Sequence, residues 1–305
     1  MSPRLILSRL RTAAVPPHSY TTLQSPLVWS LVFTALNCAL DWLFIFPLGM
    51  GARGAALGTI IAQYVALIPL LYKLNEKYPL VEGFERSRFL ESLRTYLKAG
   101  GHVMLRTVAK VSAYAMCSRK AALLGPTPAA AYQLTFQLGF ATTQVCEAGA
   151  VATQSLLAGA VATKDKDRCR GVVRLGLGWG FLAAGVLSAA TFLGRTRVID
   201  SLSTSPGVRS ACGAVFPAVL LCQVLKGGAY ATNGCVLGAL DWGFSNLVMW
   251  MSNFAIVAFL WGGEVTLGRL WWGLSLFMGV QVVASLGRVL SGTGPFRVLR
   301  ESRGP

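Results

Sequence analysis

The stretch of sequence that decides the fold is Leu27–Leu48, which reads LVWSLVFTALNCALDWLFIFPL. A helix needs about 20 apolar residues to cross about 30 Å of hydrocarbon, so a run of this length predicts a membrane span. Asp41 places a carboxylate within the run. A charge at membrane depth is costly unless it is paired, protonated or open to a wet cavity. The stretch therefore predicts a spanning helix with a polar functional position.

Asp41 shares its helical face with other polar residues. Asn37, Thr34 and Ser30 precede it, and at 100° per residue all four side chains fall within an arc of about 60°. A polar seam with one ionisable group in an apolar helix indicates a cation or proton site. The alternative is an Asp that caps or hydrogen-bonds a neighbouring helix.

The composition extends this prediction to the whole chain. Of the 305 residues, 54% are hydrophobic and only 13% are charged. The apolar stretches are Leu27–Leu48, Ala55–Tyr72, Leu97–Leu124, Ala129–Val161, Val172–Leu193, Ala211–Leu240, Phe244–Trp261 and Leu270–Val289. We predict an all-α polytopic membrane protein with about eight transmembrane helices. Leu97–Leu124 is the weakest of these spans because basic residues interrupt it.

The net charge of +16 does not indicate nucleic-acid binding. The Lys and Arg residues lie mostly in loops beside the apolar stretches, as in membrane proteins whose basic loops face the cytosol. This bias places both termini on the cytosolic, stromal or matrix side. The cysteines form no C-x-x-C pair, and the chain has only two histidines. Because no catalytic or phosphate-binding motif occurs either, we expect no enzyme and no cofactor.

A second polar stripe occupies the stretch Ala129–Val161. Its members fall within an arc of about 100° on one helix; they are Gln133, Gln137, Gln144, Glu147 and Gln154. Hydrogen bonds between helices are the alternative, but each is worth only about 1 kcal/mol or less in membranes. We predict that this stripe lines a substrate cavity. Ala129–Val161 and Ala211–Leu240 should each form one long helix of about 30 residues, or about 45 Å.

A basic stripe lies on the third span. Lys98, His102, Arg106 and Lys110 follow one another at a spacing of four residues. Long side chains near helix ends commonly reach the interface, which is the simpler interpretation for the first two. Lys110 lies deeper, and Arg106 and Lys110 are predicted to line the cavity. A basic wall there favours an organic anion as the substrate.

Several motifs occur together in a fixed order. They are Asn37-Cys-Ala-Leu-Asp41, Gly49-Met-Gly-Ala-Arg-Gly-Ala-Ala-Leu-Gly-Thr59, Leu105-Arg-Thr107, Leu124-Gly-Pro126, Ala131-Tyr-Gln133, Glu147-Ala-Gly-Ala-Val-Ala-Thr-Gln154 and Asn233-Gly-Cys-Val-Leu-Gly-Ala-Leu-Asp241. This set resembles helices five to eleven of the multidrug and toxic compound extrusion (MATE) transporters, and above all their DinF-type branch, which includes plant plastid members. The resemblance covers about residues 24–292.

The resemblance implies a partial MATE fold. Members of the family have twelve helices in two lobes of six, and this chain starts at the position of the fifth helix. We therefore expect an incomplete gene model, or a chain that does not transport alone. The resemblance also assigns Asn37, Asp41 and Thr59 to a cation site for H⁺ or Na⁺. In the family an acidic residue on the missing first helix completes that site.

The expected organisation has five parts. Residues 1–26 form a basic segment, which is either a transit peptide or a cytosolic loop. Residues 27–74 are the last two helices of the N-lobe, 75–95 a linker on the cytosolic side, 96–292 a six-helix C-lobe and 293–305 a basic tail. We expect a monomer in the lipid bilayer of the plastid envelope or the plasma membrane.

The resemblance implies a secondary active antiporter that exports organic compounds or xenobiotics in exchange for H⁺ or Na⁺. Two other classes stay open. One is a membrane remnant that does not transport and instead regulates a full-length relative. The other is an intramembrane enzyme that modifies lipids with Asp41 or Glu147 as a base, although neither carboxylate has a histidine nearby in the sequence.

Overall fold

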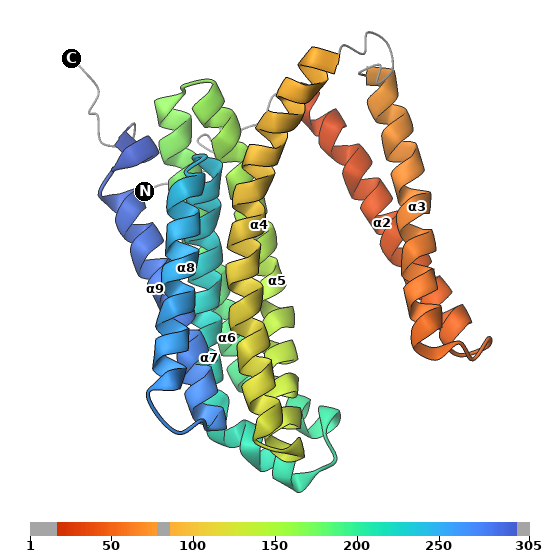
Figure 1. The fold of residues 1–305 in the computed structure, drawn as a ribbon, viewed down its shortest axis with the longest axis vertical. Helices are drawn as coiled ribbons and strands as arrows, with labels where there is room; N and C mark the ends of the chain where they lie inside the picture. Colours follow the sequence, from red (N-terminus) through yellow and green to blue (C-terminus); the bar gives the residue numbers. More distant parts are fainter. Residues whose placement is uncertain (1–16, 78–85, 298–305) are drawn as a thin grey trace, which may run out of the picture. The chain divides into compact units, whose positions relative to one another are not determined.

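The computed structural model describes residues 17–77 and 86–297, and this part of the chain is helical between its turns. The elements are α2 (Pro17–Ile45), α3 (Gly51–Lys77), α4 (Arg86–Leu123), α5 (Pro126–Ala162), α6 (Lys166–Leu202), α7 (Pro206–Gly238), α8 (Trp242–Trp261), α9 (Leu267–Leu290) and the short η1 (Gly294–Phe296) (Figure 1). The chain divides into two compact units between Arg94 and Thr95, within α4.

The first unit contains a hairpin of α2 and α3. Gly49 and Gly51 have φ angles of 62° and 53°, so the turn uses the left-handed conformation that glycine adopts without strain. Gly54 lets the helices approach closely, because a Cβ there would lie 2.9 Å from Phe44. Much of the apolar surface is exposed, as for Leu31 and Trp42. Such a surface suits contact with lipid or with further helices.

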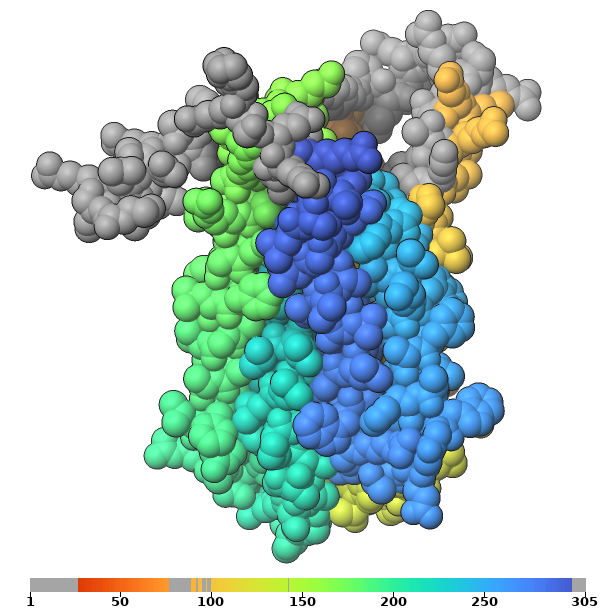
Figure 2. All heavy atoms as spheres, turned by 90° about the vertical axis from the view of Figure 1, so that its left-hand side faces the viewer, coloured from red at the N-terminus to blue at the C-terminus, as the bar shows by residue number. Residues whose placement is uncertain are grey.

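The second unit is a helical bundle with α7 at its centre. This helix packs against α5, α6 and α9, and α8 packs against α9 (Figure 1). Figure 2 shows the surfaces of α8 and α9 side by side along the bundle. Asn253 of α8 ties α4 into the unit, since its amide donates to the Ala109 carbonyl at 2.7 Å and to Ser112 Oγ at 2.8 Å.

Small residues allow α7 to lie close to its neighbours. A Cβ on Gly234 would lie 2.6 Å from the carbonyl oxygen of Ala150 on α5. A Cβ on Gly227 would collide with the Ala184 side chain on α6. In lipid, where helices gain little hydrophobic free energy from association, such close packing supplies much of the attraction.

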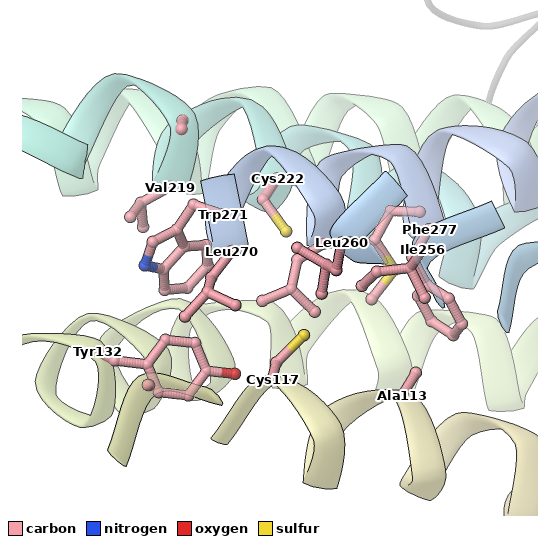
Figure 3. Packing of buried hydrophobic residues seen from close by; sticks show 14 of the residues in the cluster. Ala113, Cys117, Tyr132, Val219, Cys222, Ile256, Leu260, Leu270, Trp271 and Phe277 are labelled. Atoms are coloured by element: carbon pink, nitrogen blue, oxygen red, sulfur yellow. The ribbon is translucent and has the colours of Figure 1, made fainter. Parts of the chain in front are cut away.

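The core between α4, α5, α7, α8 and α9 is rich in aromatic and aliphatic side chains. Figure 3 shows Cys117 and Ala113 of α4 facing this cluster, which includes Trp271 and Phe277 of α9. Phe277 is fully buried, and the rings of Tyr132 and Trp271 lie 5.9 Å apart. The small side chains of α4 leave room for these large groups.

The predicted fold class is confirmed, with differences in detail. Seven helices in the described part are long and apolar enough to cross a membrane. The exception is α4, because its basic residues lower its hydropathy. α5 and α7 are single helices of 37 and 33 residues, as predicted. α3 continues to Lys77 and α4 begins at Arg86, so much of the expected linker is helical. The expected basic segment 1–26 falls largely outside the described residues.

Candidate functional site

The first candidate site lies on the seam between α2 and α3. Asn37 Nδ2 donates hydrogen bonds to Thr59 Oγ1 at 3.1 Å and to Asp41 Oδ1 at 3.4 Å. The structure thus brings together the three residues assigned from the sequence. Gly58 leaves room for the carboxylate at this position, because a Cβ at Gly58 would lie 2.6 Å from Asp41 Oδ1.

The chemistry of this polar trio fits a small hard cation or a proton. A carboxylate, a hydroxyl and an amide supply oxygen ligands of the kind that hard cations prefer. The Thr59 hydroxyl donates to the Ala55 carbonyl at 3.0 Å, which turns its lone pairs toward Asn37. In the described geometry the Asn37 amide nitrogen faces the carboxylate, so a Na⁺ ion would require the amide to turn its oxygen inward. Thr34 bonds to its own helix at Ser30 and extends the polar seam.

The second candidate site is a cavity of about 180 Å³ within the six-helix unit. Among its lining residues are Arg106 and Lys110 of α4, Glu147 of α5 and Lys226 of α7. Three cations therefore share this cavity with one carboxylate. We call it the cationic cavity.

The charged side chains of the cationic cavity differ in how they are held. Lys226 Nζ lies 4.4 Å from the centre of the Phe140 ring, a distance suited to a cation–π interaction. Tyr230 and Glu147 both line this cavity. The Nε atom of Arg106 is buried and has no hydrogen-bond partner in the described part of the chain. A ligand oxygen in the cavity would satisfy that donor.

Buried amides form the α7–α9 side of the cavity. Asn233 Nδ2 donates to Gln281 Oε1 at 3.0 Å, and Ser285 Oγ donates to Asn233 Oδ1 at 3.4 Å. Gln281 Nε2 donates to the Phe277 carbonyl at 3.1 Å. This network fixes the amide positions, so the wall is polar and rigid.

Only two of the five residues of the predicted cavity stripe line the cationic cavity. Glu147 and Gln154 line the cationic cavity, whereas Gln133, Gln137 and Gln144 are exposed and lie outside its lining. Gln133 and Gln137 lie too far along α5 to reach this cavity, since at 1.5 Å per residue they are about 21 Å and 15 Å from Glu147. Gln144 lies one turn away but points outside the cavity.

The basic stripe is also divided. Arg106 and Lys110 reach the cavity, whereas His102 Nδ1 lies 2.8 Å from Asn246 Nδ2 on α8. The side chain of Lys98 is outside the described residues. His102 thus serves helix packing in the second unit.

Sequence reasoning missed most of the α7 and α9 contribution. Lys226, Tyr230 and Asn233 follow the spacing i, i+4, i+7, and that pattern could have identified one polar face of α7. Gln281 gave no such signal because it stands among apolar residues of α9. Its pairing with Asn233 depends on how two helices pack.

The helical architecture, with seven candidate spans in the described part of the chain, defines a multi-pass membrane protein. A sequence model of the MatE family matches residues 103–256. The chain belongs to this family. Because its members are transporters, the alternative of a lipid-modifying enzyme is set aside.

One similar curated protein is Protein DETOXIFICATION 44, chloroplastic, of Arabidopsis thaliana. It is 30% identical, over 95% of this chain and 58% of its own length. The Vibrio cholerae MATE transporter VcmN in its bent form is 18% identical, with a TM-score of 0.72 over 90% of this chain and 62% of that one. A Pyrococcus furiosus transporter of the MOP superfamily, whose reversed pocket polarity is said to suggest a different function, is 20% identical with a TM-score of 0.75 over 90% and 63%.

These comparisons show the fold and the family. The chain spans 58% of DETOXIFICATION 44 and 62% of VcmN, which is less than two thirds of either protein. The described helices therefore correspond to a partial MATE fold.

Proposed function

We propose that this chain forms part of a secondary active transporter that exports small organic compounds in exchange for H⁺ or Na⁺. The observation that carries the proposal is the cationic cavity, a polar cavity inside a bundle of membrane-spanning helices. Polar and ionisable groups inside a membrane protein mark substrate or ion pathways more often than structural sites. The ordered motifs of the sequence support a place in the DinF-type branch.

The polar trio of Asn37, Asp41 and Thr59 is the proposed coupling site. Protonation of Asp41, or binding of Na⁺ by its oxygens, would neutralise a charge within a membrane span and change which helix packing is stable. An ion biases a two-state protein only by binding the two states with different affinity, and a carboxylate at a helix seam supplies that difference.

The charge balance of the cationic cavity favours an organic anion as substrate. Arg106, Lys110 and Lys226 face a single carboxylate, Glu147. Uncompensated charge in a low dielectric is costly, so an anionic ligand that pairs with the cations would be stabilised there. Tyr114 and Phe277 also line the cavity and would accommodate an aromatic group on such an anion.

Localisation and assembly are part of the same proposal. The chloroplastic description of DETOXIFICATION 44 favours the plastid envelope over the plasma membrane. We propose a monomer that is surrounded by lipid, with residues 27–74 ending an N-lobe, 75–95 as the linker, 96–292 as the C-lobe and 293–305 as a basic tail.

Reconstitution into vesicles tests the proposal. The chain would be inserted alone, and in parallel joined to an N-lobe from a MATE relative, and uptake of a fluorescent organic anion would be followed after imposing a pH or Na⁺ gradient. We expect gradient-driven uptake in the joined protein. Binding without transport by the chain alone would favour the remnant alternative, and no binding or transport in either form would contradict the proposed function.

A further inference from the structure

A second cavity of about 300 Å³ lies at the end of the six-helix unit where α5 passes into α6. Leu157 and Val161 of α5, Val173 of α6 and Phe296 of η1 supply apolar walls. Lys164 and Lys166 also line it. We call this space the interfacial cleft; it shares no lining residue with the cationic cavity.

The position of the interfacial cleft places it at the membrane surface. The candidate span on α5 ends at Ala162, and α6 begins at Lys166. The α5–α6 turn and η1 lie at the same end of the bundle (Figure 1). The apolar walls therefore begin at the level of the acyl chains, and the lysines lie at the level of the headgroups.

The charged residues that line the cleft are all basic. Among the described residues that line it, two are lysines and none is acidic. The nearby Asp165 caps α6 by accepting from the Arg168 amide at 3.0 Å, and Asp167 lies 3.6 Å from Arg170. These contacts place the two carboxylates within the loop's own structure.

We propose that the interfacial cleft binds an anionic phospholipid, with its phosphate at Lys164 and Lys166 and part of one acyl chain against the apolar walls. Basic pockets at the ends of membrane helices recognise lipid headgroups through the same combination of charge and position. A volume of about 300 Å³ is at the small end of ligand sites, which suits part of one chain rather than a whole lipid.

Native mass spectrometry of the full chain in detergent tests this, with phosphatidylglycerol or phosphatidylcholine added. Wild-type protein should retain at least one phosphatidylglycerol more strongly than phosphatidylcholine. The double variant Lys164→Ala/Lys166→Ala should bind phosphatidylglycerol about 25-fold more weakly, because each basic residue near the headgroup contributes about a fivefold factor. Equal retention of both lipids by wild-type protein would overturn the proposal.

Matched controls separate a site from general surface charge. Arg195→Ala/Arg197→Ala removes the same charge from the other end of α6 and should leave the retained lipid unchanged. Val161→Trp keeps both lysines but fills the cleft, so it should also displace the lipid. The proposal fails if both double variants lose lipid equally, if Val161→Trp has no effect, or if glycerol 3-phosphate binds as tightly as the lipid.

Discussion

The α2–α3 hairpin and the six-helix unit differ in how completely their polar side chains are hydrogen-bonded. In the hairpin, Asp41 has the Asn37 amide as a partner at 3.4 Å, and much of the surrounding apolar surface is exposed. In the six-helix unit, Asn233 is bonded by both Gln281 and Ser285 and is buried. The amide network of α7 and α9 is thus satisfied within the six-helix unit, whereas the hairpin keeps a carboxylate with one long hydrogen bond.

The two regions also differ in the sign of their charge. The hairpin seam carries a carboxylate, and the cationic cavity carries three cations against one carboxylate. The difference suggests a division of roles, with the coupling cation in the hairpin and an organic anion in the six-helix unit.

The largest effect is expected at Asp41. Asp41→Asn removes the only ionisable group of the polar trio and should abolish gradient-driven transport in the protein joined to an N-lobe. Insertion should not be impaired, since removing a charge from a membrane span favours the membrane. Flux into vesicles after a pH or Na⁺ jump measures this, with the exposed Glu76→Gln at the end of α3 as the control. Transport at the wild-type rate by Asp41→Asn would contradict the proposal that the hairpin holds the coupling site.

A large loss of stability is expected at the α5–α7 contact. Gly234→Ala should destabilise the six-helix unit by about 1–3 kcal/mol, because its Cβ would collide with the Ala150 backbone. Gly178→Ala is the matched control on α6, where nothing lies within 4 Å of the added Cβ, and it should be neutral or slightly stabilising. Thermal unfolding in detergent compares the two. Similar melting temperatures would mean that α5 and α7 do not pack this closely.

A smaller loss is expected at the ion pair between Arg288 and Asp241. Arg288 Nε and Nη2 lie 3.1 Å and 3.0 Å from Asp241 Oδ2, and the guanidinium covers the Phe244 ring at 4.7 Å. Because both side chains are largely buried, Asp241→Ala should cost about 1–2 kcal/mol. Asp200→Ala, which breaks a more exposed pair with Arg209, should cost about 0.5 kcal/mol or less. Equal costs in chemical unfolding would show that burial does not strengthen the first pair.

Much of the fold could be predicted from hydropathy alone, but the helix ends could not. α4 begins at Arg86, eleven residues before the apolar stretch that starts at Leu97. Hydropathy detects only the part of a helix that lies in hydrocarbon, and polar turns beyond the membrane leave no such signal. The same limit explains why α4, with its basic residues, is the helix that falls short of the criteria for a span.

In the cationic cavity, periodicity found residues on a single helix and missed the contact between two helices. Periodicity placed Arg106 and Lys110 on one face of α4, and both line the cationic cavity. It also grouped Gln133 with Glu147, although they lie too far apart along α5 to share a cavity of this size. The pairing of Asn233 with Gln281 joins α7 to α9, and the spacing of residues within a single helix cannot predict it.

Ligand binding to the cationic cavity tests the division of roles most directly. Purified chain in detergent would be titrated with an aromatic carboxylate and with a lipophilic cation, for wild-type protein, Arg106→Ala and Lys110→Ala, with the exposed Arg119→Ala on the same helix as control. The account predicts that each cavity variant weakens anion binding at least tenfold, or about 1.4 kcal/mol, and leaves cation binding unchanged or stronger. Equal loss of both ligands, or tighter binding of the cation by wild-type protein, would contradict it.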